Sequence, residues 1–304
     1  MSAPHVPTGR RAAVRVPATS ANLGPAFDSA GLALGLHDEV QVETIDSGCE
    51  VDVDGEGAQQ VPRGEEHLVV RAIRAALDSA RVPQPGLRLR TVNRIPHGRG
   101  LGSSAAATVA GLLAARALLD PDDARCLDDR TLLGLAVGFE GHGDNVGACL
   151  LGGLVLVWGN GGGMRATQLP LDPRITATVL VPATELSTAR ARGLLPESVP
   201  HRVAAHAAGH AALLVHALAE RPDLLLAATE DRLHQPYRAS AFPDSMALVE
   251  RLRGDGFAAV ISGAGPSVLV LGRPDEPALP AVDGWSERPL PVDPAGATVL
   301  ADAT

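Results

Sequence analysis

Two kinds of apolar pattern alternate along the chain. Apolar residues at helical spacing predict helices over residues 66–80, from 103 onward, 129–139, 200–219 and 244–255. Short apolar or alternating runs predict strands over residues 13–16, 39–45, 50–53, 87–93, 154–158, 175–181, 258–262 and 267–271. Helices and strands that follow one another in this irregular order favour an α+β fold over a doubly wound parallel sheet.

A glycine-rich stretch near the middle of the chain, residues 159–163, is typical of a turn or a domain junction. We therefore expect two domains, residues 1–163 and residues 164–304. The chain after Gly272 is rich in proline and weakly patterned, so no regular element is assigned to it.

The absence of lysine excludes several kinds of enzyme chemistry. All 26 basic residues in this chain of 304 are arginine, since no lysine occurs. Without lysine there is no Schiff base of the kind that pyridoxal-phosphate enzymes and lysine aldolases need, and no Walker A lysine. Any anion that this protein binds must be held by arginine, by backbone amides or by a metal ion.

Charge and apolar content indicate which partners and which cellular compartment this protein has. The 26 basic and 35 acidic residues give a net charge of −9, and only seven aromatic residues occur, so we expect no nucleic-acid partner. The uncharged residues 145–164 include seven glycines, which is poor material for a spanning helix, and no signal peptide is expected. Cys49, Cys126 and Cys149 form no CxxC pair and are expected as small core residues in a reducing compartment. These observations predict a cytoplasmic protein without a membrane partner.

One glycine-rich loop has the pattern of an anion site. Gly98, Gly100 and Gly102 lie between a predicted strand and a predicted helix, where the backbone N–H groups of a helix N-terminus face an incoming anion. Either Ser103 or Ser104 is expected to cap this helix, which leaves the other hydroxyl for a phosphate oxygen or a metal ion. The plainer alternative is a glycine turn followed by an N-cap.

A second loop, residues 17–28, gathers polar side chains between two predicted strands. Thr19, Ser20, Asn22 and Asp28 all lie within it. Binding residues are common on loops that rigid elements anchor in this way. Asp28 is suited to an ammonium group of a ligand, and the alternative is an Asx turn before a strand.

Two shorter segments carry further candidate groups. Glu140 suits Mg²⁺, which takes one or two carboxylates beside substrate phosphates, while His142 and Asn145 suit a substrate. The alternative is an ordinary turn at a helix C-terminus. Residues 261–269 form a glycine turn between apolar strands, which indicates close backbone approach to a ligand or to the chain itself.

In this order, the loops resemble the signature motifs of the GHMP small-molecule kinases. The strings that carry the likeness are Val16-Pro-Ala-Thr-Ser-Ala-Asn-Leu-Gly-Pro25, Pro96-x-x-x-Gly-Leu-Gly-Ser-Ser-Ala-Ala106, Glu140-Gly-His-x-Asp-Asn145, Leu186-Ser-Thr-x-x-Ala-Arg192, His234-Gln-Pro-Tyr-Arg238 and Ser262-Gly-Ala-Gly-Pro-Ser267. Together they span Ala13 to Gly272. Ala26 and Gly143 stand where glycine and proline are usual, which changes loop geometry but removes no chemical group.

The resemblance implies a two-domain GHMP kinase fold. Its N-terminal part would be an α/β sandwich with a left-handed βαβ-type phosphate loop, and its C-terminal part a ferredoxin-like α+β domain. It also implies ATP and Mg²⁺ as cofactors, with Mg²⁺ held by Ser104 and Glu140. The residues that it assigns to ATP are Pro96, His97, Gly98, Arg99, Gly100, Leu101, Gly102, Ser103, Ser104, Ala105 and Ala106.

The first motif is similar to that of family members that phosphorylate L-homoserine, so this amino acid is the implied substrate and threonine biosynthesis the implied pathway. The implied catalytic residues are Ser104, Glu140 and Asn145. The implied substrate-binding residues are Asn22, Asp28, His142, Asn145, Arg192, Arg238 and Gly265, with Asp28 facing the ammonium group and the two arginines facing the carboxylate. No residue is assigned as general base, and substrate positioning is expected to suffice.

Other interpretations stay open. One is a GHMP kinase for a different small alcohol, such as mevalonate or a diphosphocytidyl sugar alcohol, and another is a non-catalytic sensor of nucleotide or amino acid. His206 and His210 have the i, i+4 spacing of a zinc pair, but no third ligand is near them in the sequence, so a helix surface is expected. Arg190 is expected to be solvated. The resemblance also favours a homodimer.

Overall fold

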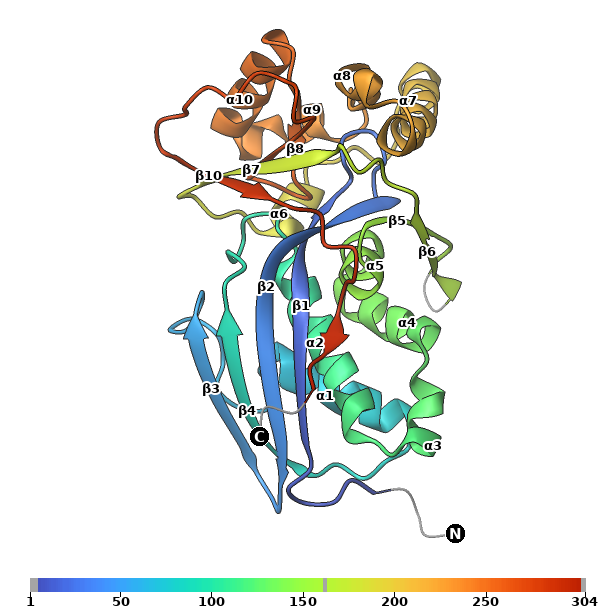
Figure 1. Ribbon diagram of the computed structural model, residues 1–304, viewed down its shortest axis with the longest axis vertical. Coiled ribbons are helices and arrows are strands. Elements are labelled where there is room, and N and C mark those ends of the chain that lie inside the picture. Colours follow the sequence, from blue (N-terminus) through green and yellow to red (C-terminus); the bar gives the residue numbers. More distant parts are fainter. Residues whose placement is uncertain (1–4, 161–162, 302–304) are drawn as a thin grey trace.

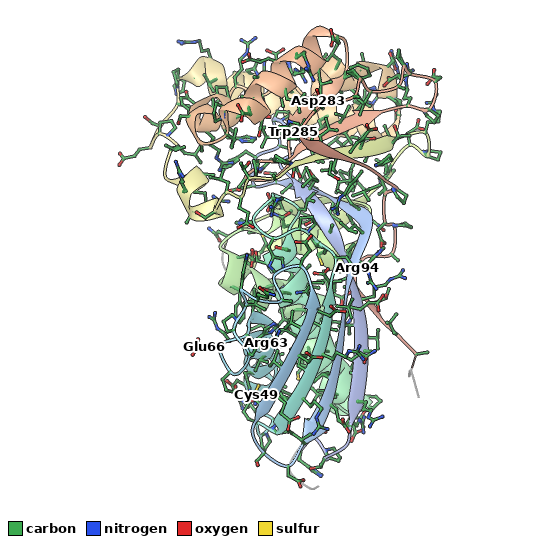
Figure 2. The ribbon with its side chains drawn as sticks, turned by 90° about the vertical axis from the view of Figure 1, so that its left-hand side faces the viewer. Cys49, Arg63, Glu66, Arg94, Asp283 and Trp285 are labelled. Atoms are coloured by element: carbon green, nitrogen blue, oxygen red, sulfur yellow. The ribbon has the colours of Figure 1, made fainter. Side chains whose placement is uncertain are left out.

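The chain folds into two stacked lobes, each built on its own sheet. The computed structural model describes residues 5–160 and 163–301 (Figure 1). Within these ranges, the lower lobe contains a seven-stranded sheet and the upper lobe a four-stranded sheet. In the side view of Figure 2, Cys49 labels the lower lobe, and Asp283 and Trp285 label the upper lobe. Mixed sheets and helices in two lobes confirm the α+β class.

The lower sheet is mixed in strand direction. Its strands are β1 (Arg11–Ala21), β2 (Ala30–Ile45), β3 (Cys49–Gly55), β4 (Gly86–Asn93), β5 (Leu154–Trp158), β6 (Arg165–Leu169) and β11 (Thr298–Val299). The main path runs in the order β11-β1-β2-β4-β3, and β5 and β6 extend the sheet from β2. Strands β3 and β4 pair in parallel, whereas the other pairs are antiparallel.

Helices cover one face of the lower sheet (Figure 1). They are α1 (Leu68–Ser79), α2 (Ser103–Leu118), the short α3 (Pro121–Ala124) with the 3-10 turn η1 (Arg125–Leu127), α4 (Asp129–Glu140) and α5 (Asp144–Leu151). Helix α2 is buried along most of its length. At Gly111, a Cβ atom would lie 2.4 Å from the Val69 carbonyl oxygen, so glycine allows α1 and α2 to approach closely. Because α2 begins at the predicted phosphate loop, its burial fixes the direction of that helix N-terminus.

The upper lobe is an antiparallel sheet with helices packed around it. Its strands are β7 (Thr176–Pro182), β8 (Ala258–Ile261), β9 (Val268–Gly272) and β10 (Trp285–Leu290), in the order β10-β7-β9-β8. The helices are α6 (Thr188–Arg192), α7 (His201–Ala219), α8 (Leu225–Ala228), α9 (Gln235–Arg238) and α10 (Pro243–Gly254), with the 3-10 turns η3 (Pro222–Leu224) and η4 (Ala239–Ala241). The left-handed crossover and the ferredoxin-like topology stay predictions.

Strands β1 and β2 are longer than the apolar pattern predicts. The predicted strands end at residue 16 and resume at residue 39, yet β1 runs to Ala21 and β2 begins at Ala30. Thr19 and Ser20 pair within the β1–β2 ladder, and both side chains are buried. A hydroxyl group can occupy a buried strand position when it has a hydrogen-bond partner, and the hydroxyls of Ser20 and Ser262, a residue of the upper lobe, are hydrogen-bonded to each other at 2.8 Å. The remaining loop reaches toward the upper lobe (Figure 1).

The lower sheet also takes strands from the far side of the glycine-rich stretch. Strand β6 pairs with β5, and β11 from the weakly patterned tail pairs with β1. An ion pair between His37 and Asp293 ties the same tail to β2. The lower lobe is therefore not one continuous stretch of sequence, and the boundary between residues 163 and 164 stays a prediction.

The three cysteines occupy different environments. All are free thiols; Cys149 is buried as expected, but Cys126 is exposed and Cys49 is half-buried, so the expectation of three core residues is wrong for Cys126.

No helix of residues 5–160 and 163–301 has the length and apolar character needed to cross a membrane. The cytoplasmic location and the homodimer stay predictions.

Candidate active site at the junction of the two lobes

One cavity between the lobes gathers side chains from all the predicted loops. Its volume is about 230 Å³. The predicted site residues that line it are Asn22, Asp28, Gly98, Arg99, Gly100, Leu101, Gly102, Ser103, Ser104, Glu140, His142, Asn145, Arg192 and Arg238. Asp144, Ser187, Gly263 and Ala264 also line it, although none of them was predicted as a site residue. Loops that are far apart in the sequence therefore form one site.

Helix α2 begins at the phosphate loop without a side-chain cap. Gly102 is the N-cap residue, in the left-handed conformation (φ 70°), and no side chain caps the first turn. The Ala106 N–H donates to the Gly102 carbonyl at 2.8 Å as the helix begins. The N–H groups of Ser103, Ser104 and Ala105 precede that bond and lie at the helix end that binds anions. The expectation that a serine caps this helix is wrong, because a glycine occupies that position.

The upper lobe holds the phosphate loop from two sides. On one side, Ser262 Oγ donates to the Gly100 carbonyl at 2.7 Å. On the other, the Leu186 N–H donates to the Gly98 carbonyl at 2.8 Å. Space at Gly100 is so limited that a Cβ atom would lie 2.2 Å from the Ser262 carbonyl oxygen. The two lobes therefore fix the backbone of this loop jointly.

Arg99 contributes to the same attachment. Its Nε and Nη2 atoms donate to the carbonyls of Pro182 and Ala183 at 3.0 and 2.7 Å, and its Nη1 lies 3.2 Å from a carboxylate oxygen of Glu185. These contacts fasten the loop to the end of β7. In this structure the guanidinium positions the loop, and a contact from Arg99 to ATP stays a prediction.

Ser104 and Glu140 lie together although they are distant in the sequence. Ser104 Oγ donates to Glu140 Oε2 at 2.7 Å. Glu140 is the last residue of α4, and Gly141 ends that helix in the left-handed conformation (φ 78°). A hydroxyl and a carboxylate oxygen are both ligands that Mg²⁺ accepts, and open N–H groups for a phosphate lie beside them. The donor set therefore fits a magnesium ion bound with a phosphate.

Asp28 and Arg192 form an ion pair that spans the two lobes. Arg192 Nη2 lies 2.6 Å from Asp28 Oδ1, and Nη1 lies 3.1 Å from Oδ2. Both side chains are about one-third exposed, at 36% and 34%. Asn22 supports the pair, because its Oδ1 accepts the Asp28 N–H at 3.0 Å. Two residues predicted to bind opposite charges of one substrate thus neutralise each other here.

Arg238 is a buried cation in the same cavity. Only 2% of the residue is exposed, and among the described residues it forms no ion pair. Its Nη1 lies 3.4 Å from His234 Nδ1, and its guanidinium lies 5.1 Å from the Phe27 ring centroid. Its Nε has no hydrogen-bond partner in the part of the chain that the structure describes. Burial lowers the pKa of Arg238. A buried guanidinium without a carboxylate is a strong candidate for binding an anionic ligand.

His142 and Asn145 lie at the start of α5. His142 Nδ1 is 2.8 Å from Asp144 Oδ1, and the Asp144 side chain is almost fully buried. Burial by itself would lower the pKa of His142, but the hydrogen bond and the negative charge of Asp144 outweigh it and raise the pKa above 6.5. Asn145 Oδ1 accepts from Thr19 Oγ1 at 2.8 Å. Asp144 is therefore a positioning residue that sequence reasoning missed.

This arrangement predicts how His142 titrates. In the wild type, we expect the NMR titration midpoint of His142 above 6.5, and in Asp144→Asn we expect it below 6.5, because burial is then uncompensated. Since the folded-state pKa is raised, the stabilisation from charged His142 is fully present below about pH 6.5 and is lost as the pH rises through the folded-state pKa. The variant His142→Gln identifies the resonance. Equal midpoints in the wild type and Asp144→Asn would contradict this interpretation.

Several predicted residues lie outside this cavity. Pro96, Ala105 and Ala106 are buried beneath the loop. Gly265 is in the left-handed conformation (φ 81°), and its N–H donates to the Ser262 carbonyl at 2.8 Å, while Gly263 and Ala264 of the same turn face the cavity. A substrate contact from Gly265 stays a prediction.

A second cavity adjoins the other side of the phosphate loop. Its volume is about 250 Å³, and it is lined by His97 together with Val61, Pro62, His67, Leu68, Asn93, Ser103 and Ser104, among others. His67 Nδ1 is buried there without a hydrogen-bond partner among the described residues. Sequence reasoning missed this cavity because its apolar residues are typical of an ordinary core and form no motif.

Comparison with known proteins agrees with this geometry. Residues 67–153 match the family "GHMP kinases N terminal domain", and residues 210–289 match "GHMP kinases C terminal". The chain is 56% identical to the homoserine kinase of Streptomyces coelicolor, with 98% of each chain covered, and 51% identical to that of Mycobacterium tuberculosis, with 91% and 89% covered. The crystal structure of homoserine kinase from Cytophaga hutchinsonii superposes with a TM-score of 0.81 at 26% identity, covering 96% of this chain and 98% of that one. Fold, motifs and relatives together show that this chain belongs to the GHMP kinase family.

Proposed function

We propose that this kinase transfers the γ-phosphoryl group of ATP to the hydroxyl group of L-homoserine, giving O-phospho-L-homoserine for threonine biosynthesis. The observation that carries the proposal is the buried cation Arg238, which shares one cavity with the Asp28–Arg192 ion pair beside the phosphate loop. An amino acid carries a carboxylate and an ammonium group, and this cavity holds a partner for each. Relatives that are 50–56% identical and are named homoserine kinase support the same substrate.

The phosphate loop would bind the triphosphate without lysine. The N–H groups at the start of α2 are not capped by a side chain, and together with those of the loop glycines they would bind the phosphate oxygens. Ser104 and Glu140 would hold the magnesium ion, since their oxygens are already 2.7 Å apart. When bound, Mg²⁺ supplies the positive charge that offsets the charge on the transferring phosphoryl group.

The amino-acid end of the substrate would lie between Asp28 and the two arginines. Arg238 is fixed in place by burial, by Phe27 and by His234, so it provides a preorganised cation for the carboxylate. Arg192 would turn from Asp28 toward the same carboxylate, which leaves Asp28 for the ammonium group. A planar guanidinium can bind a carboxylate through two hydrogen bonds, which fixes orientation as well as charge.

The hydroxyl end would lie toward the phosphate loop. Asn145 is held by Thr19 next to Gly102, since a Cβ atom at Gly102 would lie 3.1 Å from Asn145 Oδ1. His142, held by Asp144, also lines the cavity. Phosphoryl transfer depends mainly on positioning and on charge neutralisation, so these residues can serve by orienting the hydroxyl, and we assign no general base.

The second cavity is suited to the adenine ring of ATP. It shares Ser103 and Ser104 with the main cavity, so a nucleotide whose phosphates lie on the loop can place its base there. Its lining is largely apolar, which suits a planar aromatic ring. His67 Nδ1, which has no hydrogen-bond partner among the described residues, is a hydrogen-bonding group within it. This placement adds His67 and Val61 to the nucleotide site.

A substrate panel tests the proposal. Turnover of ATP should be measured with L-homoserine, mevalonate and shikimate in parallel, and the product identified by mass. We expect turnover with L-homoserine alone, because neither other alcohol has an ammonium group for Asp28. Retained ATP binding without turnover of L-homoserine would favour a nucleotide sensor, and faster turnover of mevalonate would favour another GHMP kinase activity.

Replacing Arg238 with methionine tests the carboxylate site. We expect KM for L-homoserine to rise by about 30-fold, the lower end for removal of one partner of a buried charged contact, while KM for ATP changes little. The melting temperature should not fall, because methionine fills the space and no buried cation remains. A variant that melts normally and keeps the wild-type KM for L-homoserine would refute this role of Arg238.

A further inference from the structure

A cluster of metal-binding side chains lies in the upper lobe, away from the residues that line the active-site cavity. It consists of His206 and His210 on α7 and Glu230, which follows α8. One potential ligand atom from each residue lies within 4.8 Å of the others. The histidine spacing alone predicts a helix surface, but the fold adds the third ligand that the local sequence lacks.

The two imidazole rings are aligned as a pair. Their centroids are 3.7 Å apart and their planes differ by 11°. His206 is largely buried, with 12% of its side chain exposed, and neither of its ring nitrogens makes a hydrogen bond within the described residues. Its Nε2 nevertheless lies 3.3 Å from Glu230 Oε1. A largely buried imidazole whose nitrogens make no hydrogen bond within the described residues still has a nitrogen lone pair available for a metal ion.

Neighbouring groups hold the other two ligands in metal-binding form. His210 Nδ1 lies 3.0 Å from the His206 carbonyl oxygen, a contact that places the proton on Nδ1 and leaves the Nε2 lone pair free. Arg232 donates to Glu230 Oε1 from Nε at 2.9 Å and from Nη2 at 2.6 Å.

We propose that His206, His210 and Glu230 form a binding site for Zn²⁺ or a similar transition-metal ion, separate from the magnesium site. Two imidazoles and one carboxylate are a donor set that zinc accepts, with water completing the coordination. Mg²⁺ prefers oxygen ligands, so the site distinguishes the two metals by its nitrogen donors. Three protein ligands beside a cationic arginine give weaker binding than a four-ligand structural zinc site.

A metal ion at this position would stabilise the segment that connects Glu230 to α9, the helix that carries Arg238. Glu230 is followed by Asp231, whose carboxylate accepts the N–H groups of Leu233, His234 and Gln235 at 2.7, 3.2 and 2.8 Å. These bonds set the start of α9, the helix that carries Arg238. A bound ion would link this segment to α7, so we expect it to stabilise the fold rather than to take part in the reaction.

Zinc binding can be measured on the untagged full-length protein after removal of metals by chelation. We expect a titration against a chromophoric chelator to show one Zn²⁺ bound per chain, and Co²⁺ to give a visible absorption band at the same stoichiometry. Binding should weaken at least tenfold in His206→Ala, His210→Ala and Glu230→Gln. Excess Zn²⁺, but not Mg²⁺, should raise the melting temperature of the wild type by about 5 °C, a typical shift for a saturating ligand.

His216→Ala is the matched control. His216 lies on the same helix and also has a glutamate at i+4, with 3.5 Å between His216 Nδ1 and Glu220 Oε2, but it lies outside the cluster. This variant should bind Zn²⁺ as the wild type does. The proposal is overturned if the wild type binds no stoichiometric Zn²⁺, or if the cluster variants bind as tightly as His216→Ala. Because Mg²⁺-dependent kinase activity is a separate measurement, either result leaves the proposed function unaffected.

Discussion

Replacement of Glu140 by glutamine is expected to lower kcat about 1000-fold, the scale of losing one charged group that acts in a transition state. Glutamine keeps the size of the side chain and a hydrogen-bonding oxygen for Ser104, which lies 2.7 Å from the carboxylate in the wild type. The variant therefore removes the charge that would hold Mg²⁺ and little else. Steady-state kinetics over a range of Mg²⁺ concentrations measures the effect, and higher Mg²⁺ should restore part of the activity.

Glu185→Gln is the control for this substitution. Glu185 is also a carboxylate beside the phosphate loop, 3.2 Å from Arg99, but it is half-exposed and lies outside the cavity lining. Its loss should leave kcat within a few-fold of the wild type, because an exposed ion pair contributes little. If Glu140→Gln behaves like Glu185→Gln, Glu140 is not the metal ligand.

A second large effect is expected from Gly100→Ala, with a loss in kcat/KM of about 100-fold or more. The added Cβ atom would lie 2.2 Å from the Ser262 carbonyl oxygen, and Gly100 has a φ of 70° that alanine rarely adopts. The loop or the Ser262 turn must then move, and a displacement near 1 Å at a reacting group can cost about 100-fold in rate. Kinetics with ATP as the varied substrate, together with direct ATP binding, measures the change.

Gly98→Ala separates backbone strain from steric conflict. Gly98 has a similar φ of 63°, but its nearest neighbour would be the Glu185 Cβ at 3.4 Å, an ordinary contact. We expect a loss of about 1 kcal/mol in stability from the left-handed backbone and a reduction in kcat/KM below about 10-fold. Comparable losses in the two variants would show that strain alone, and not contact with the upper lobe, limits the loop.

Much of the fold follows from local patterns in the sequence. Apolar periodicity predicts α1, α4, α7 and α10 to within a few residues, because each buries one regular face. It does not predict β6, β10 or β11, which are mostly half-buried or exposed strands without a clear alternation. These strands depend on partners far along the chain, which a local pattern does not contain.

In the candidate site, too, local motifs identify some residues, whereas other features depend on contacts between distant parts of the chain. Motifs identify Glu140, Arg192 and Arg238 as residue types with suitable chemistry, and the fold brings them into one cavity. Spacing cannot show that Arg238 is buried without a carboxylate, or that Glu230 approaches His206. Both facts depend on packing between elements of the upper lobe. Asp144 was missed for a related reason: its role is to hold His142, which becomes evident only from the 2.8 Å contact.

The ion pair between Asp28 and Arg192 has a consequence for selectivity. The two charges satisfy each other through two hydrogen bonds, so a molecule that enters between them must first separate a bidentate contact. In the proposed binding mode, an amino acid would restore two ion pairs in exchange for the one that it disrupts. A simple alcohol restores none, and a molecule with a carboxylate but no ammonium leaves Asp28 uncompensated. On this proposal, the ion pair would favour amino acids over substrates that offer a hydroxyl group alone.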